Sequence, residues 1–257
     1  MNKELFSIII PSWNNLPYLK CCIDSILKNS DYKHQIIVYI NDGTDGTLEW
    51  VKENKIDYGY SEENAGICVA MNEGRRLMKT PYLVFFNDDF YACPHWDKIM
   101  WDYIKSLKTD RFFIAGTQIQ RKGHCYGLTI NAEYGHNIED FDEQRLLKEY
   151  DKYECPDDNF ACAPPNLIPV SLWDEVGGYS MEFSPGYASD PDLTAKLYFK
   201  AKVTHFHQLS GSRVYHFMNK STSRNTNMNI YRGKVWNQKW KFKRSELKRL
   251  IKRISTG

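Results

Sequence analysis

Three adjacent polar residues, Asn87, Asp88 and Asp89, follow an unbroken apolar run at residues 83–86. Mg²⁺ in proteins is commonly held by one or two carboxylates together with phosphate groups of a substrate. One of two neighbouring Asp side chains can bind such a cation while the other accepts a hydrogen bond from a ribose hydroxyl. The alternative is an ordinary turn, because Asn and Asp also bend chains through local hydrogen bonds.

Short apolar runs alternate with helical patterns around this motif. Runs rich in β-branched and aromatic residues predict strands, and apolar positions three or four apart predict helices. The expected strands are residues 6–10, 36–40, 58–60, 83–86, 112–119 and 213–215. The expected helices are residues 16–27, 47–53, 67–78, 96–107, 171–176 and 193–199. This alternation favours an α/β fold with a mainly parallel central sheet and helices on both faces, whereas residues 120–158 predict irregular structure.

The loops after the strands should hold the ligand, since in open α/β sheets ligands bind beyond the carboxyl ends of the strands. Those loops are residues 11–15, 41–46 and 87–90, and each contains Asn or Asp. No expected strand is followed by Gly-x-Gly-x-x-Gly or by Gly-x-x-x-x-Gly-Lys-Ser/Thr, the motifs that cradle phosphate with backbone amides. A carboxylate-bound cation is the obvious substitute.

Five segments in one order resemble glycosyltransferase family two, a large family of inverting enzymes with the GT-A fold. They are FSIIIPSWNN, NDGTDGT, NAGICVAMNEG, FFNDDF and GGYSMEFSPGYASDPDLTAKL, and the resemblance covers about residues 6–218. It implies a Rossmann-like, mainly parallel sheet and a metal-dependent enzyme that uses Mn²⁺ or Mg²⁺. It also implies that a sugar is transferred, with inversion, from a nucleoside diphosphate sugar to a hydroxyl of a glycan or lipid-linked acceptor in surface polysaccharide or lipopolysaccharide assembly.

By position, the resemblance assigns donor binding to the ends of the first two strands, to an Asn-x-Gly stretch and to the Asn-Asp-Asp motif. These donor-binding residues are Pro11, Ser12, Trp13, Asp42, Asn64, Gly66, Asn87 and Asp88. Asp89 is the implied metal ligand and Asp88 faces the ribose, although the motif begins with Asn where the family more often has Asp. His216 resembles a late metal-binding His of some members, with a structural role as the alternative. Arg213 or Lys220 could instead neutralise the diphosphate.

The catalytic base of the family falls on Asp190, because the Asp of its Glu-Asp motif is retained there while Ser189 replaces the Glu. This carboxylate would take the proton of the acceptor hydroxyl as that hydroxyl attacks the anomeric carbon. An Asp before Pro191 is also a good helix cap, and a helix N-terminus lowers the basicity of a carboxylate. The two roles are compatible, and Asp192 is the second candidate for the base.

The acceptor side is implied by a tight Gly-Gly-Tyr turn and by nearby aromatic rings. The residues assigned to it are Trp173, Gly178, Tyr179, Tyr187 and Asp192. Trp173 and Tyr187 are the candidate rings for stacking on a sugar, and ordinary core packing is the alternative for both.

The net charge of +2 conceals an asymmetry. Residues 219–257 carry 12 Lys and Arg against a single Glu, whereas the other 218 residues carry 22 basic and 31 acidic side chains. Apolar residues recur in this tail at helical spacing: Trp236, Trp240, Leu247, Leu250, Ile251 and Ile254. Such a basic amphipathic helix either binds anionic lipid or packs its apolar side on the protein. We expect one catalytic domain over residues 1–218, with a nucleotide-binding half at 1–119 and an acceptor half at 120–218, followed by this tail.

Composition limits the remaining possibilities. The seven cysteines form no Cys-x-x-Cys pair, which favours reduced thiols without a metal or redox role. No apolar run reaches the length that crosses a bilayer, and the first residues do not resemble a secretory signal, so we expect a cytoplasmic protein that can sit peripherally on the inner face of the membrane. The alternatives are a sugar-nucleotide-binding homologue without turnover, a nucleotidyltransferase, and a nucleic-acid-binding protein, against which the acidic body of the chain argues.

Overall fold

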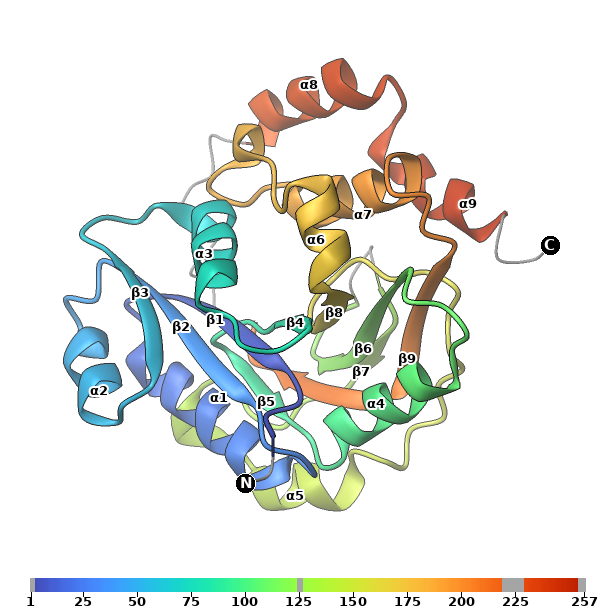
Figure 1. Ribbon diagram of the computed structural model, residues 1–257. Helices are drawn as coiled ribbons and strands as arrows, with labels where there is room; N and C mark the ends of the chain where they lie inside the picture. Colours follow the sequence, from blue (N-terminus) through green and yellow to red (C-terminus); the bar gives the residue numbers. More distant parts are fainter. Residues whose placement is uncertain (1–2, 124–126, 219–228, 254–257) are drawn as a thin grey trace.

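The computed structural model describes residues 3–123, 127–218 and 229–253 (Figure 1). Within these residues, nine strands form one sheet in the spatial order β3-β2-β1-β4-β8-β6-β9-β5, and β7 pairs with β6. The strands are β1 (Ser7–Trp13), β2 (Gln35–Asn41), β3 (Asp57–Ser61), β4 (Tyr82–Phe85), β5 (Phe90–Ala92), β6 (Phe112–Gln120), β7 (Thr129–Asn131), β8 (Asn166–Pro169) and β9 (His205–His216).

The sheet is mostly but not strictly parallel. β1 runs parallel to β2 and β4, β2 to β3, and β6 to β7 and β9. β8 lies antiparallel between β4 and β6, and β5 is antiparallel to β9. The expectation of a mainly parallel α/β sheet is confirmed, while β5 and β8 are strands that the apolar pattern did not predict.

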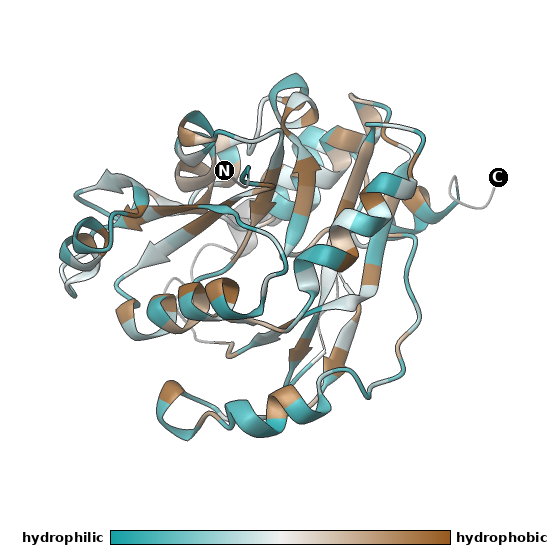
Figure 2. Ribbon diagram, turned by 60° about the horizontal axis from the view of Figure 1, so that its bottom comes forward, coloured by the Kyte–Doolittle hydropathy of each residue, from teal (hydrophilic) through white to brown (hydrophobic). Residues whose placement is uncertain are grey.

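Helices cover both faces of the sheet (Figure 1). The helices are α1 (Leu16–Asn29), α2 (Thr47–Glu53), α3 (Gly66–Gly74), α4 (Trp96–Ser106), α5 (Glu143–Glu149), α6 (Val170–Val176), α7 (Ser189–Phe199), α8 (Asn229–Trp240) and α9 (Leu247–Lys252). Successive side chains of a strand point to opposite faces, so Ile8 and Ile10 of β1 pack with α1 and α4, whereas Ile9 packs with α3, α6 and α7. Figure 2 shows the resulting hydrophobic stretches along the central strands.

The first strand is longer than expected, and this corrects the position of three donor residues. β1 continues to Trp13, which pairs with Asn41, so Pro11, Ser12 and Trp13 belong to the strand rather than to a loop. A proline is tolerated at this position because β4 pairs only with Ser7–Ile9 of β1 and ends before Pro11. The helix expected over 67–78 also ends earlier, at Gly74, and continues as a 3₁₀ turn over Arg75–Leu77.

The region expected to be irregular, residues 120–158, contains two short elements, β7 and α5, between loops. Leu146 of α5 and Ile130 of β7 are buried with Tyr215 in a small, separate hydrophobic cluster. Their apolar sides are too short to give a clear periodic pattern, which is why the sequence did not reveal them.

The described part of the basic tail, residues 229–253, packs on the body of the protein beside α7 (Figure 1). Trp236, Leu247 and Ile251 are almost completely buried and belong to the same core cluster as Leu193 of α7. The apolar residues of the tail were expected either to bind lipid or to pack on the protein, and packing is observed for these three. Ile254 lies outside the described part of the chain. Among the described residues, no helix combines the length and the hydropathy needed to cross a membrane.

Candidate functional site

The carboxyl ends of β1 and β4 bring Ser12 and Asp88 into contact. The hydroxyl of Ser12 donates a hydrogen bond of 2.8 Å to Oδ2 of Asp88. Asp88 and Asp89 are 7% and 5% exposed, in a turn closed by the amide of Phe90 and the carbonyl of Asn87. Burial and the neighbouring charge of Asp89 raise the pKa of Asp88, against the hydrogen bond from Ser12. The turn predicted as the alternative is present, but it holds a buried carboxylate pair that a cation would stabilise.

His216 lies beside Asp89 because β5 and β9 are paired. Phe90 of β5 is directly opposite His216 of β9, and Nε2 of His216 is 3.3 Å from Oδ2 of Asp89. Nδ1 of His216 lies 2.8 Å from Oε1 of Gln120 and 3.2 Å from Oε1 of Gln118. Because these amide oxygens accept hydrogen bonds, we assign the proton to Nδ1, which leaves the Nε2 lone pair facing Asp89.

The donor set of Asp89 and His216 is chemically suited to Mn²⁺ or Mg²⁺. Among the described residues, no three His, Cys, Asp or Glu side chains form a cluster that could enclose a metal ion. Such a site does not need one, since these cations commonly take one or two protein ligands and complete their coordination with substrate phosphates and water. The glutamines that orient His216 are the kind of outer partner that metal-binding His side chains usually have.

The loops after β1 and β2 meet at a second polar contact. Nδ2 of Asn14 donates to Oδ2 of Asp42 at 2.9 Å and to the hydroxyl of Thr44 at 3.1 Å. Asp42 has a φ of +71°, a conformation that Asp adopts more readily than most residues. The Thr44 hydroxyl is the largest cause that lowers the pKa of Asp42, so this carboxylate is ionised at the rim of the site.

Asn64 and Gly66 connect the donor side to the loop that leads into α7. Oδ1 of Asn64 accepts from the amide of Gly66 at 3.0 Å, and the amide of Ile67 donates to the carbonyl of Pro185 at 2.6 Å. Gly66 has a φ of +81°, and a Cβ at this position would lie 2.4 Å from Cα of Pro185. Only glycine permits this approach, which joins the first and second halves of the sequence.

Asp190 lies near the start of α7, where Oδ1 accepts a hydrogen bond from the hydroxyl of Tyr179. Burial raises the pKa of Asp190 to about 6, and the Tyr179 hydrogen bond opposes this increase. The Tyr179 ring packs against Phe85, the last residue of β4, with centroids 6.3 Å apart. Tyr179 therefore links Asp190 to the strand that leads, three residues later, to Asp88.

The expected capping role of Asp190 is wrong. α7 begins at Ser189, and its N-cap is Ala188 with a φ of +65°, so Asp190 is inside the first turn and its side chain is bonded to Tyr179. The helix N-terminus does not leave the carboxylate weakly basic, because the effect of burial is larger and the pKa of Asp190 is raised.

The structure also corrects several acceptor and diphosphate assignments. Asp192 is 0% exposed and accepts hydrogen bonds from Ser180 and Trp240, so it is a structural anchor rather than a second base. Trp173 is 3% exposed and packs against Tyr179, so its ring offers no face for a sugar. Arg213 is buried and donates to backbone carbonyls, including that of Tyr153 at 2.7 Å, so it is not available to a diphosphate.

The remaining predictions divide as follows. The tight turn is present: Gly177 and Gly178 both have positive φ, and a Cβ on Gly178 would lie 2.3 Å from Oδ1 of Asn72. Tyr179 is buried and serves Asp190 instead of an acceptor. Tyr187 is partly exposed in the loop before α7, and its stacking role stays a prediction. Lys220 lies outside the described residues.

Two groups of residues were missed at the sequence level. Gln118 and Gln120 orient His216, and their spacing of two within a strand could have indicated a shared face. Lys239 and Trp240 reach Asp192 from the tail, 47 and 48 residues away in the chain, and no local pattern announces such a contact.

Similarity to known proteins extends over most of the chain. Residues 7–165 match the family described as Glycosyl transferase family 2. An uncharacterized glycosyltransferase of Rickettsia prowazekii is 38% identical over 230 residues, which are 87% of this chain and 68% of that protein. The chondroitin synthase of Escherichia coli is 23% identical over 84% of this chain, but only 30% of its own length is matched. For two other curated relatives the matched share of their length is 14% and 36%.

Comparison with solved structures concerns the fold. The crystal structure of S. aureus TarS 1-349 in complex with UDP has a TM-score of 0.60 and 17% sequence identity, over 82% of this chain and 60% of that one. The same fragment in complex with UDP-GlcNAc has a TM-score of 0.58 and 19% identity, over 82% and 58% of the two chains.

Proposed function

This chain belongs to glycosyl transferase family 2 and has the GT-A fold, and we propose that it moves a sugar from a nucleoside diphosphate sugar to a hydroxyl of a glycan or lipid-linked acceptor during surface polysaccharide assembly. The observation that carries this proposal is the placement of Asp190. Its half-buried carboxylate is joined through Tyr179 to β4, which leads to the Asp88 and Asp89 carboxylates. The UDP and UDP-GlcNAc complexes of TarS support a nucleotide-sugar donor.

In the proposed reaction Asp190 is the base. A pKa of about 6 leaves it mostly ionised at pH 7 while keeping it more basic than an ordinary Asp. The acceptor hydroxyl would transfer its proton to this carboxylate while its oxygen bonds to the anomeric carbon and the bond to the diphosphate breaks. Attack on the side opposite to the diphosphate inverts the anomeric centre.

On the donor side, Asp89 and His216 would hold Mn²⁺ or Mg²⁺. When bound, the cation would neutralise the charge of the departing diphosphate. Gln118 and Gln120 keep His216 turned toward Asp89, and Ser12 holds Asp88 in a position to accept from a ribose hydroxyl. Pro11, Trp13, Asp42, Asn64, Gly66 and Asn87 remain the proposed contacts of the nucleotide.

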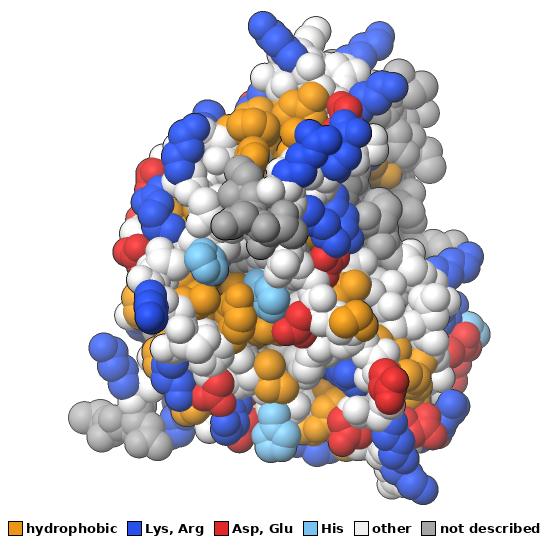
Figure 3. Space-filling model, turned by 90° about the vertical axis from the view of Figure 1, so that its right-hand side faces the viewer, with side chains coloured by type: hydrophobic (Ala, Val, Ile, Leu, Met, Phe, Trp, Pro, Cys, Tyr) orange, Lys and Arg blue, Asp and Glu red, His pale blue; other side chains and the backbone are white. Residues whose placement is uncertain are grey.

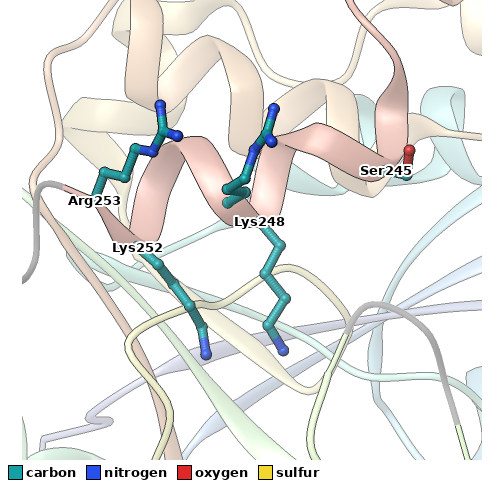
Figure 4. A pocket seen from close by; sticks show the side chains of 5 residues that line it. Ser245, Lys248, Lys252 and Arg253 are labelled. Carbon is teal, nitrogen blue, oxygen red and sulfur yellow. The ribbon is translucent and has the colours of Figure 1, made fainter.

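The proposal includes peripheral attachment to an anionic membrane through the tail. Since its apolar side is covered, attachment would use the cations of α9 and not insertion. An open hollow is lined by Ser245, Lys248, Arg249, Lys252 and Arg253. Figure 4 shows Lys248 and Lys252 pointing together from α9 and Arg253 pointing to its other side. Figure 3, seen from the side of α9, shows Lys and Arg gathered toward the end of the molecule where the tail lies.

A ligand panel tests the proposed function. We expect a UDP-, GDP-, CDP- or dTDP-sugar to raise the melting temperature, and more so with Mn²⁺, because a ligand of the folded state stabilises it. Release of the nucleoside diphosphate in the presence of a glycan acceptor then measures turnover. Binding without turnover on any acceptor would favour the non-catalytic homologue, and release of pyrophosphate would favour a nucleotidyltransferase.

A further inference from the structure

The buried carboxylate of Asp192 is held by two residues of the tail. Nε1 of Trp240 donates to Oδ1 of Asp192 at 2.8 Å, and Nζ of Lys239 lies 2.8 Å from the same oxygen. The other oxygen, Oδ2, accepts from the hydroxyl of Ser180 at 2.6 Å. Asp192 is in the first turn of α7, two residues after Asp190.

Lys239 also holds the segment that precedes α7. Its ammonium donates to the hydroxyl of Ser180 at 2.8 Å and to Oε1 of Glu182 at 2.7 Å. Ser180 follows Tyr179 directly in the chain, and Tyr179 is the residue that donates to Asp190. The tail therefore contacts both ends of residues 179–192, the segment that carries Asp190 and its hydrogen-bond donor.

We infer that Lys239 and Trp240 are positioning residues, which fix the catalytic carboxylate of Asp190 by holding Asp192 and Ser180 in place. This inference rests on the proposed function of Asp190 as the base. It assigns to the tail a part in catalysis that is separate from membrane attachment, because these two side chains point into the protein and not toward the cations of α9.

The physical reason is the cost of leaving a buried carboxylate without donors. Without Lys239 and Trp240, Asp192 would keep Ser180 and the ammonium of Lys196, which is 3.9 Å away and donates to the carbonyl of Gly178. A buried carboxylate that loses hydrogen bonds and its counter-charge strongly favours a conformation closer to water. The first turn of α7 would move with Asp192, and Asp190 is in that turn.

The charged groups around this contact define what the tail can change. Lys196 of α7 and Lys239 of α8 face Asp192, while Glu182 pairs with Lys239 and Lys200 adds charge near Lys196. For Asp190 itself, burial raises the pKa and the hydrogen bond from Tyr179 lowers it, and the charge of Lys239 is not among these causes. A change in the pKa of Asp190 after substitution of Lys239 would therefore indicate that the first turn of α7 has moved, and not merely that a nearby charge has been lost.

The test compares Trp240→Phe and Lys239→Met with Lys234→Met. Trp240→Phe keeps a ring against Phe199 while removing the Nε1 donor, and Lys239→Met keeps the aliphatic stem. Lys234 is exposed on the same helix, so its substitution removes the same charge without touching Asp192. The first readout is a ¹³C NMR titration of the Asp190 carboxyl, assigned by its absence in Asp190→Asn. The second is kcat and KM for UDP release from UDP-GlcNAc with Mn²⁺ and a glycan acceptor.

We expect both test variants to lower the pKa of Asp190 toward the ordinary Asp value, because residues 179–192 become more hydrated. We also expect both to lower kcat roughly tenfold or more, with KM for UDP-GlcNAc nearly unchanged. Lys234→Met should behave as the wild type in both measurements. A titration of Asp190 identical in all four proteins would overturn the inference, even if the test variants melt earlier. Absence of turnover in the wild type with every nucleotide sugar of the ligand panel would instead count against the proposed function, while the titration would still decide the positioning role.

Discussion

The hydroxyl of Tyr179 donates a hydrogen bond to the carboxylate of Asp190, eleven residues further along the chain. The backbone of Tyr179 is held in turn by Asn72 of α3, whose amide group bonds both the N–H and the carbonyl of Tyr179 at 2.9 Å. The position of Asp190 therefore depends on α3, which begins at the donor side, as well as on α7. The buried ring of Tyr179 therefore connects the proposed base to the proposed donor side of the site.

Asp190→Asn should abolish sugar transfer while preserving donor binding. An amide cannot take the proton of the acceptor hydroxyl, and general-base catalysis of this kind contributes about 10²- to 10⁴-fold. Nucleoside diphosphate release measures the loss, and the melting-temperature increase caused by UDP-GlcNAc with Mn²⁺ should match that of the wild type. Transfer at more than a tenth of the wild-type rate would exclude Asp190 as the base.

The same substitution should make the fold more stable at neutral pH. Because the folded state raises the pKa of Asp190 to about 6, ionisation of this group opposes folding increasingly as pH rises from about 4 through 6. Replacing the carboxylate by an amide should therefore increase the free energy of unfolding at pH 7 by roughly 2 to 3 kcal/mol and have little effect near pH 4. Urea unfolding at both pH values provides the measurement, and a loss of stability at pH 7 contradicts the argument.

Tyr179→Phe should move the acidic limb of the kcat profile to higher pH. The hydroxyl of Tyr179 stabilises the ionised form of Asp190, so its removal raises the pKa of Asp190 above about 6. The base must be ionised, and activity relative to the wild type should fall further at pH 6 than at pH 8. Tyr198→Phe is the matched control, because the Tyr198 hydroxyl bonds the carbonyl of Leu250 away from Asp190. An unchanged profile would remove Tyr179 from the mechanism.

Asp89→Ala should remove the effect of Mn²⁺ on donor binding. The proposed cation would lose its carboxylate ligand, and His216 alone is a weak site for such a hard cation. Isothermal titration of UDP-GlcNAc with and without Mn²⁺ should then give equal affinities, whereas the exposed control Asp24→Ala keeps the difference. Undiminished Mn²⁺ stimulation in Asp89→Ala would refute the ligand assignment.

Arg249→Gln combined with Arg253→Gln should weaken binding to anionic vesicles. Each basic residue near a phosphatidylserine-containing surface contributes about 1 kcal/mol, so two substitutions should reduce the partition coefficient roughly 30-fold. Sedimentation with phosphatidylserine vesicles at low salt measures the binding. The control is Lys52→Gln combined with Lys108→Gln, which removes two exposed charges outside the tail. Equal binding of the two double variants would place attachment elsewhere or nowhere on this chain.

The parts of the fold that local composition determines could be predicted from the sequence. The β-branched runs around Ile9 and Val38 became strands, and the helix expected over residues 47–53 has those bounds. β8 could not be read in this way, because its four residues contain a proline and acquire their partners only when β4 and β6 flank them.

In the candidate site, too, only the features that depend on local sequence could be predicted. Asp88 and Asp89 were found because they follow an apolar strand, and their burial is a result of that position. The environment of Asp190 could not be read locally. Its pKa depends on Tyr179 and on burial, and these come from the packing of α3 and α7 rather than from the adjacent Pro191.

Because Trp236, Leu247 and Ile251 complete the main core, the tail is not a removable appendage. A protein shortened before residue 229 would present an uncovered apolar surface to water and leave the Asp192 carboxylate without its indole donor. Aggregation of such a fragment would say nothing about lipid affinity or turnover. The role of this segment has to be studied by single substitutions, with the whole polypeptide intact.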